Sequence, residues 1–185
     1  MLALPIRVMA RPFHGYRELA AASETPSIVL GAGRFLIALG ALVSVSATGR
    51  FAPIEAFLAM LSFSWLPLVH AISIALTVRV FAPSFGWKRA FAFYLQGIGP
   101  WMLLFLVFIG GVIFAPHPER PSFILWGPTL LVASVWSIVI SYALYRAGLG
   151  LSRGRAALAT LLFWVSNHVL ILGYFLVVGQ LWPIL

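Results

Sequence analysis

Cysteine is absent from this chain of 185 residues. Without a thiol, the protein forms no disulfide, thiolate nucleophile, iron–sulfur cluster or cysteine-based zinc site. Acidic residues are nearly as scarce, with 4 Asp and Glu residues against 12 Lys and Arg residues. Because these acids lie far apart in the sequence, they exclude a paired-carboxylate catalytic site and an acidic motif for Mg²⁺ and pyrophosphate.

Charged residues of either sign make up only 9% of the chain, whereas 62% of it is hydrophobic. The mean hydropathy of +1.04 is far above that of a water-soluble domain. The length suits one domain, and five membrane spans of about 20 residues with short connectors account for nearly all of it. The composition therefore predicts an integral membrane protein whose function lies in its helices or their short loops.

The hydropathy pattern predicts an all-α fold with five transmembrane helices. Residues 1–25 are expected to form a cytoplasmic interfacial segment with one short helix, since Arg7, Pro12 and Arg17 interrupt every apolar run that a signal peptide would need. Residues 26–185 then form a single five-helix domain. The expected spans cover, approximately, residues 27–47, 51–78, 90–114, 122–144 and 156–180.

Two prolines are expected to distort these helices. Pro67 removes a backbone hydrogen-bond donor in the second span, which favours a kink there. Pro100 ends the stretch "YLQGIGP" in the third span, and its glycines and proline together predict a bend.

Basic residues are distributed unevenly between the two sides of the predicted bundle. One side carries only Arg50 and Arg120, while nine basic residues lie on the other. Cytoplasmic loops carry an excess of Lys and Arg, so the N-terminus is predicted to lie in the cytoplasm and the C-terminus outside. The nine are Arg7, Arg11, Arg17, Arg79, Lys88, Arg89, Arg146, Arg153 and Arg155.

The basic residues are spread along the chain and do not form one run or stripe, which argues against a nucleic-acid partner. They are better explained as topology signals and as contacts for anionic lipid headgroups on the cytoplasmic face. Lys88 is the single lysine among them. This preference for arginine hints at a GC-rich bacterial genome, and hence at the bacterial cytoplasmic (inner) membrane.

Polar side chains inside the spans cost free energy in lipid unless they face a partner or a wet cavity. At about 1.5 Å of rise per residue, four of them lie roughly 9 to 12 Å from the cytoplasmic ends of four different helices. These four are Arg34, His70, Gln96 and Ser137. Asn167 and His168 lie nearer the midplane, at a depth of about 16 to 18 Å.

Two interpretations of these six residues remain open. In one, they form a polar pocket that opens to the cytoplasm, where Arg34 holds an anionic group such as a lipid phosphate. In the other, they bond to one another between helices, and Arg34 extends toward the inner headgroups. Small residues such as Gly97 and Gly110 allow close helix packing, either within the chain or between chains.

The residues that carry out catalysis or bind metals in other proteins are not grouped in this sequence. No two of the four histidines have the i, i+3 or i, i+4 spacing of a helical metal site. Glu55 lies roughly 14 Å in depth from Arg34, too far for an ion pair. The serines lack a G-x-S-x-G context, and "GLGLSRGR" lacks the lysine of a phosphate loop. The sequence therefore predicts a non-enzymatic protein without a cofactor or metal.

Three segments resemble the Yip1-domain membrane proteins, in particular their bacterial members. They are "IRVMARPFHGYREL", "FGWKRAFAFYLQGIGP" with Tyr94 followed by Pro100, and "VWSIVISYALYRAGLGLSRGRAALATLLF". The resemblance implies a five-helix bundle with a cytoplasmic N-terminus that acts through helix and lipid contacts, without a known enzymatic activity. We therefore expect an accessory subunit that contacts other membrane proteins or a second copy of itself. The alternative is a transport or lipid-handling subunit with a cytoplasm-facing polar pocket.

Overall fold

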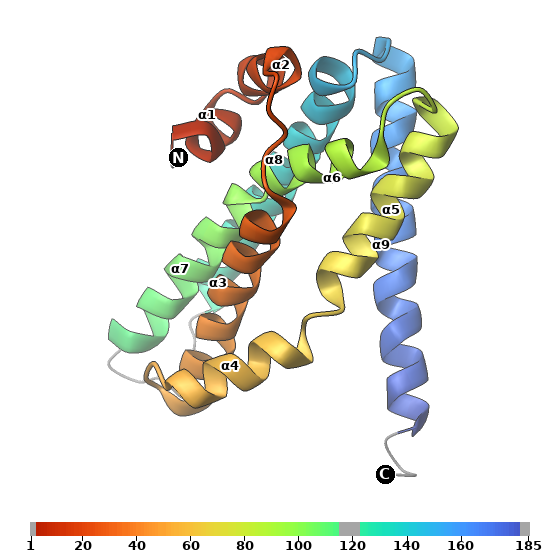
Figure 1. Ribbon diagram of the computed structural model, residues 1–185. Helices are drawn as coiled ribbons and strands as arrows, with labels where there is room; N and C mark the ends of the chain where they lie inside the picture. Colours follow the sequence, from red (N-terminus) through yellow and green to blue (C-terminus); the bar gives the residue numbers. More distant parts are fainter. Residues whose placement is uncertain (1–2, 115–122, 182–185) are drawn as a thin grey trace.

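The computed structural model describes residues 3–114 and 123–181, and it contains helices but no strand within these ranges (Figure 1). Two short helices precede the longer ones, and a five-residue π-helical turn, η1, separates the last two. The elements are α1 (Ala3–Ala10), α2 (Pro12–Ala21), α3 (Ile28–Thr48), α4 (Pro53–Ser62), α5 (Leu66–Phe81), α6 (Trp87–Gln96), α7 (Gly99–Phe114), α8 (Phe123–Ala143), η1 (Leu144–Gly148) and α9 (Arg153–Leu181). The all-α prediction is confirmed for the described residues.

Five helical stretches of the described chain are long and apolar enough to cross a membrane. They are Ile28–Thr48, Pro53–Phe81, Trp87–Phe114, Gly127–Gly148 and Arg153–Val178. The predicted number of spans is therefore confirmed by length and composition. The third and fifth begin earlier than predicted, because a helix continues beyond its apolar stretch into residues that suit a polar interface. Arg120 and the predicted start of the fourth span at residue 122 lie outside the described residues.

Both prolines interrupt their spans at the predicted places. The second span divides into α4 and α5 around residues 63–65, and Pro67 occupies the first turn of α5, where a missing N–H is tolerated. The third span divides into α6 and α7 at Gly97 and Ile98, just before Pro100. In Figure 1, α6 crosses the bundle while α7 runs along it. The bend thus turns α6 toward the interior of the bundle.

The N-terminal segment forms two helices where the sequence analysis expected one. Pro12 begins α2 directly after Arg11, so the chain turns between α1 and α2. The Glu18 carboxylate of α2 lies 3.2 Å from Arg7 Nη1 of α1, which ties the two helices together. It also lies 3.0 Å from His14 Nε2 within α2. Tyr16 on the opposite face of α2 is fully buried against the bundle. This pair of helices is therefore packed on the rest of the fold.

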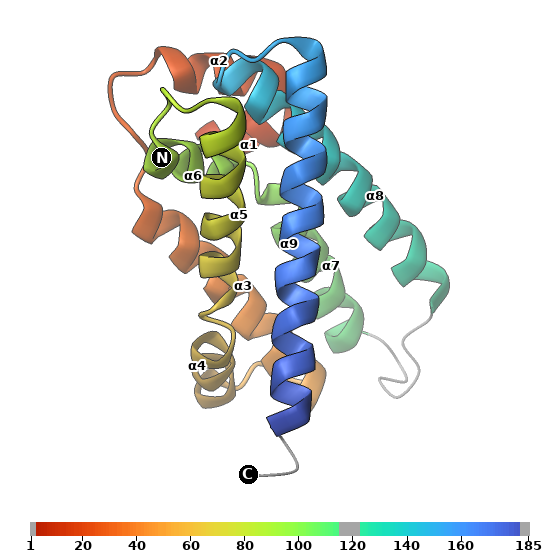
Figure 2. The same cartoon turned by 90° about the vertical axis from the view of Figure 1, so that its right-hand side faces the viewer.

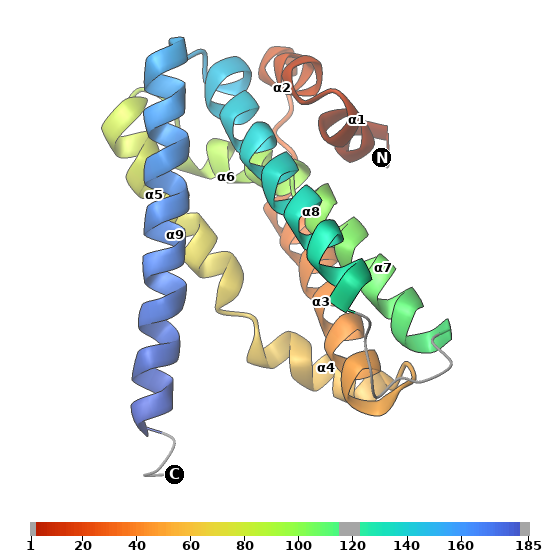
Figure 3. The ribbon, with the colours of Figure 1, turned by 180° about the vertical axis from the view of Figure 1, so that it is seen from behind.

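The three views of the ribbon show two ends of the bundle (Figures 1, 2 and 3). One end holds α1, α2 and the connections at residues 82–86 and 149–152. The other end holds the connection between α3 and α4, the last turn of α7 and the C-terminal end of α9. Helix α9 lies along α5, and α7 lies between α3 and α8. The six helices α3 and α5–α9 thus surround one interior region.

A serine and two glycines hold α4 against α3. The Ser44 Oγ atom accepts a hydrogen bond from the Ala52 N–H and donates one to the Ala52 carbonyl, each 2.9 Å long. Gly49 ends α3 with a φ of 72°, a left-handed conformation that glycine adopts without strain. A Cβ atom on Gly40 would lie 2.5 Å from the Ala56 carbonyl oxygen. Only a glycine at position 40 permits this close approach of the two helices.

Candidate intramembrane binding site

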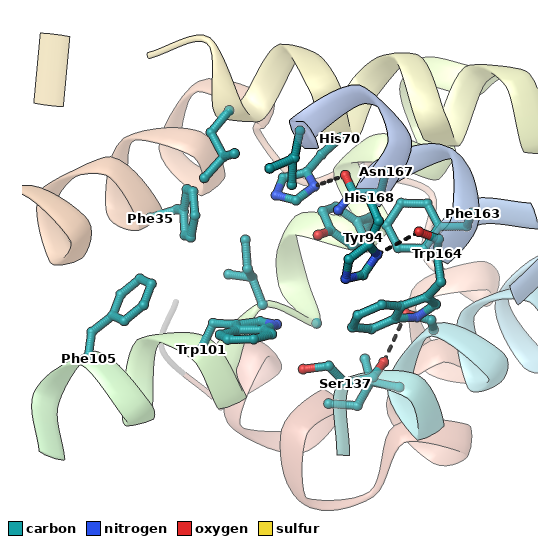
Figure 4. A pocket seen from close by; sticks show the side chains of 16 residues that line it. Phe35, His70, Tyr94, Trp101, Phe105, Ser137, Phe163, Trp164, Asn167 and His168 are labelled. Carbon is teal, nitrogen blue, oxygen red and sulfur yellow. Dashed lines mark hydrogen bonds between the residues drawn. The ribbon is translucent and has the colours of Figure 1, made fainter. Parts of the chain in front are cut away.

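A cavity of about 260 Å³ lies in the interior of the bundle (Figure 4). Every one of the five candidate membrane spans contributes to its wall. The lining residues are Phe35 from α3; Leu66 and His70 from α5; Tyr94, Gly97, Ile98, Trp101 and Phe105 from α6, α7 and the bend between them; Ser137, Ile140 and Ser141 from α8; and Phe163, Trp164, Asn167, His168 and Ile171 from α9. The cavity is therefore a feature of the whole five-helix arrangement.

Aromatic rings make up much of the wall. The Phe35 ring lies 6.0 Å from the Phe105 ring, between centroids, and the Tyr94 ring lies 5.2 Å from the Phe163 ring. Trp101 lies between these two groups in Figure 4. The bend at residues 97–98 produces this arrangement, since it directs α6 and α7 along different sides of the same cavity. Such a wall favours an apolar or ring-bearing ligand.

His70 and Asn167 form a buried hydrogen bond at one side of the cavity. The His70 Nδ1 and Asn167 Oδ1 atoms lie 2.8 Å apart, and the two residues are only 9% and 7% exposed. With the Asn167 oxygen as acceptor, Nδ1 donates, which leaves Nε2 of the neutral ring as an acceptor. Phe35 and Tyr94 flank the imidazole, with ring centroids 6.1 and 5.3 Å away. These contacts fix the orientation of the His70 ring.

His168 is held differently, by its own helix. Its Nδ1 atom donates to the Trp164 carbonyl oxygen over 2.7 Å, and the two rings stack with centroids 5.4 Å apart. The spacing i, i+4 places these side chains one above the other on α9. His168 is exposed, unlike Asn167 beside it. His70 and His168 therefore line one cavity without bonding to each other.

Two polar groups in the wall are buried without a hydrogen-bond partner among the described residues. These are the Ser137 Oγ and the Trp164 Nε1. Ser137 is 6% exposed, and its carbonyl oxygen accepts a hydrogen bond of 2.8 Å from the Ser141 hydroxyl. An unmade hydrogen bond of a buried hydroxyl or indole N–H costs about 1 to 3 kcal/mol. A ligand that bonds to Ser137 and Trp164 would offset this cost.

The structure brings together four of the six polar residues singled out in the sequence: His70, Ser137, Asn167 and His168 all line the cavity. Gln96 is buried but does not line it, because it lies two residues after Tyr94 and hence on nearly the opposite face of α6. Arg34 does not line it either. It is half-buried beside Phe35, and its guanidinium makes no hydrogen bond or ion pair with another described residue.

The sequence analysis did not select the aromatic residues of the wall. A signal for them exists on α9, where Phe163, Trp164, Asn167, His168 and Ile171 follow a spacing of three or four residues and so share one face. Elsewhere aromatic side chains are too common in apolar helices to be distinguished. The sequence therefore allows aromatic residues of the cavity wall to be predicted only where polar residues lie on the same helix face.

The cavity offers neutral hydrogen-bonding groups. Among the residues that the structure describes, no Lys, Arg, Asp or Glu side chain lines it. Within the described residues, no three His, Cys, Asp or Glu side chains come close enough together to hold a metal ion. The wall therefore suits a neutral molecule with an apolar body and one or two hydrogen-bonding groups.

Comparison of the chain with models of protein families, with curated proteins and with solved structures finds no match. The resemblance to the Yip1-domain proteins stays a prediction from sequence. In residues 3–114 and 123–181, the fold and the cavity define an all-helical protein with five helices suited to a membrane and an aromatic-walled interior site.

Proposed function

We propose that this protein is a non-enzymatic membrane protein that binds an uncharged amphipathic molecule in the cavity between its five spans. This role is a form of the lipid-handling alternative considered from the sequence. The single observation that carries it is the Ser137 hydroxyl, which is buried in the cavity wall without a hydrogen-bond partner among the described residues. In an apolar interior, such a group favours a bound molecule that supplies the missing bond.

The chemistry of the wall limits the class of ligand. Trp164 Nε1 donates hydrogen bonds, the Ser137 hydroxyl donates or accepts them, and His70 Nε2 accepts them. A hydroxyl-bearing or carbonyl-bearing ring or chain satisfies these groups, while aromatic side chains contact its apolar part. An anionic ligand gains no salt bridge here, because Arg34 lies outside the wall. The ligand we propose is therefore neutral.

Catalysis is not part of this proposal. His70 bonds to Asn167, and the described part of the chain places no carboxylate in the cavity wall that would orient it as a general base. Ser137 and His70 come from different sides of the site in Figure 4, and no hydrogen bond joins them. A serine activated by a histidine needs that bond. Binding is the function for which these side chains are suited.

We further propose that the end of the bundle holding α1 and α2 faces the cytoplasm of a bacterium, with the membrane being its inner membrane. Arg79, Lys88 and Arg89 lie in or beside the 82–86 connection at this end, and Arg153 and Arg155 begin α9 there. The excess of basic residues at one end supports this orientation under the positive-inside rule.

The test of the proposed function is to identify the small molecules that co-purify with the protein. The wild type and a Ser137→Ala variant are purified in mild detergent, and their organic extracts are compared by mass spectrometry. We expect a neutral hydroxyl- or carbonyl-bearing compound that is enriched with the wild type and depleted with Ser137→Ala. Ser134→Ala is the matched control, since Ser134 lies one turn away on α8 and does not line the cavity. Equal extracts from all three chains would contradict the proposal.

An accessory subunit that contacts other membrane proteins or a second copy of this chain stays a prediction from sequence. The structure changes how it is tested. Gly97 packs within the chain, because a Cβ atom there would collide with the Tyr16 hydroxyl, so substitutions at Gly97 probe folding. A Cβ atom on Gly110 meets no atom within 4 Å. Gly110→Leu therefore tests association, and unchanged mobility of this variant on a blue-native gel would count against a contact through that face.

A further inference from the structure

Three arginines line a second hollow, of about 490 Å³, at the end of the bundle that holds α2. Arg17 comes from α2, Arg146 from η1 and Arg153 from the first turn of α9. Phe13, Tyr142 and Ala147 complete the lining. We propose that this arginine hollow, defined by Arg17, Arg146 and Arg153, is a binding site for a phosphate group. The inference is independent of the ligand proposed for the interior cavity.

The arginine hollow is lined by positive side chains without a negative one. Within the described ranges of the chain, no carboxylate lines it. The nearest acid on α2, Glu18, is already bonded to Arg7 and His14 and lies against a different surface depression. Three guanidinium groups that line one hollow repel one another, and a shared anion reverses the sign of that interaction.

Two of the guanidinium groups are held in place by backbone carbonyls. Arg146 Nη1 donates to the Leu151 carbonyl over 2.8 Å, and Arg17 Nε donates to the Phe13 carbonyl over 3.3 Å. Each bond uses one N–H of a group that has five. The remaining N–H groups make no hydrogen bond with the described residues, and neither does Arg153. Oriented guanidinium groups with spare donors suit the bidentate recognition of phosphate oxygens.

The hollow lies where α9 begins. Helix α9 begins at Arg153, so its N-terminal N–H groups add partial positive charge at the same place. The fourth and fifth candidate spans end and begin at Gly148 and Arg153. In a membrane these residues lie at the depth of the lipid headgroups. The phosphate of an anionic lipid therefore lies at the same depth as the hollow. A free phosphate ion would offer the arginines the same oxygen atoms.

The aromatic part of the lining is consistent with a lipid. The rings of Phe13 and Tyr142, which line the hollow together with the arginines, meet edge to face with centroids 6.0 Å apart. These rings provide apolar contact for the glycerol and acyl parts of a phospholipid, while the Tyr142 hydroxyl is a further donor for its oxygens. A free phosphate ion would make no use of the rings.

The test compares two double variants that lose the same charge. Arg17→Gln with Arg153→Gln removes two arginines of the hollow but keeps Arg146, whose bond to Leu151 supports the turn before α9. Arg79→Gln with Lys88→Gln is the control, because both side chains are exposed at the same end and neither lines the hollow. The full-length proteins are purified in detergent, and equal melting temperatures establish that the variants are folded.

Two ligand sources are then measured separately. Binding of short-chain phosphatidylglycerol, with phosphatidylcholine as the uncharged reference, is followed by native mass spectrometry, and binding of inorganic phosphate by equilibrium dialysis. We expect the Arg17/Arg153 variant to bind phosphatidylglycerol about tenfold more weakly than the wild type, and the control variant to match the wild type. If the Arg17/Arg153 variant binds only inorganic phosphate more weakly, while the control variant matches the wild type, the hollow is still a phosphate site but its ligand is a free ion. Equal losses in both variants, or no binding by the wild type to either ligand, would overturn the proposal.

Discussion

The Nδ1 atom of His70 lies 2.8 Å from the Oδ1 atom of Asn167, and this bond joins α5 to α9 across 97 positions of sequence. A second hydrogen bond joins the same helices near the start of α9, where Arg155 Nη2 donates to the Phe81 carbonyl oxygen over 2.6 Å. Apolar side chains and rings also meet, such as Trp65, just before α5, and Tyr174, whose centroids are 3.9 Å apart. In a membrane, apolar contacts give little preference for one helix pairing over another, because lipid tails are equally apolar. The hydrogen bond between His70 and Asn167 therefore helps to fix the register of α9 on α5.

Breaking this bond is predicted to weaken the pairing of α5 and α9. Double-mutant cycles with His70→Phe and Asn167→Leu are expected to give a coupling of about 0.5 to 2 kcal/mol, the range for hydrogen bonds between membrane helices. The measurement is denaturant unfolding in detergent. His168→Phe is the control, since His168 bonds only within α9, and it should show no coupling with His70→Phe. Additive effects of His70→Phe and Asn167→Leu would contradict the assigned bond.

Gly97→Ala is predicted to destabilise the docking of the N-terminal helices. The new Cβ atom would collide with the Tyr16 hydroxyl oxygen and lie 2.6 Å from Ile140 Cγ2. Overpacking of a buried site costs about 1 to 3 kcal/mol. Tyr16→Phe removes the nearer of these atoms, so the double variant should recover part of the lost melting temperature. Gly110→Ala, with open space around the added carbon, should change it little.

If Tyr16→Phe did not raise the melting temperature of the Gly97→Ala variant, this result would contradict the contact described between α2 and the α6–α7 bend. A loss of stability from Gly110→Ala as large as that from Gly97→Ala would also contradict the packing described for these two glycines.

Tyr16 gives a prediction for alkaline pH. Burial raises the pKa of the Tyr16 phenol well above its ordinary value, helped by the nearby Tyr94 and Tyr145. The unfolded chain releases this proton at about pH 10, whereas the folded chain keeps it, so the free energy of unfolding falls as the pH rises through that value. Tyr16→Phe removes this part of the pH dependence. The wild type and variant are compared by denaturant unfolding at neutral and at alkaline pH.

We expect the free energy of unfolding of Tyr16→Phe to rise relative to that of the wild type only at pH values above the ordinary tyrosine pKa. At neutral pH the variant should match or exceed the wild type, because the Tyr16 hydroxyl is buried without a partner among the described residues. Parallel pH profiles for the two proteins would show that Tyr16 ionises as readily in the folded state as in the unfolded one.

Ser44→Ala is predicted to loosen the turn between α3 and α4. The substitution removes two hydrogen bonds to Ala52, at a cost of about 1 to 3 kcal/mol. The half-buried Ala52 N–H loses this partner, while the Ala52 carbonyl still accepts a hydrogen bond from the Ala56 N–H. Ser62→Ala is the matched control, since the Ser62 hydroxyl is exposed and bonds only to the Leu58 carbonyl of its own helix. Amide hydrogen exchange over residues 44–56 should rise in Ser44→Ala alone. Equal exchange in both variants would contradict the role assigned to Ser44.

The sequence predicted the features of the fold that depend on position along a helix axis. Hydropathy located the five candidate spans, and Pro67 and Pro100 marked where two of them divide. The second N-terminal helix was missed, although Pro12 is a residue that commonly begins a helix. That helix is amphipathic and short, so it gives little signal in an analysis of long apolar stretches.

The candidate site could be predicted only in part, because depth can be counted along a helix while rotation about its axis depends on packing. Counting along the helices predicts one level for His70, Gln96 and Ser137; His70 and Ser137 line the cavity, whereas Gln96 does not. The bend at Gly97 and Ile98 rotates α6 relative to α7, and it brings Tyr94 to the wall in place of Gln96. No pattern within a single span specifies that rotation.

The most direct measurement of the central claim uses the absence of cysteine from the chain. A Ser137→Cys variant carries one thiol in the cavity wall, and Ser134→Cys carries one on the same helix outside the wall. The rate of labelling by a small uncharged maleimide is measured before and after organic extraction of the co-purified molecules and return of the protein to lipid. The account predicts that extraction accelerates labelling of Ser137→Cys, that adding back the extracted neutral fraction slows it again, and that Ser134→Cys is unaffected. Labelling of Ser137→Cys that is independent of both treatments would contradict a ligand in the cavity.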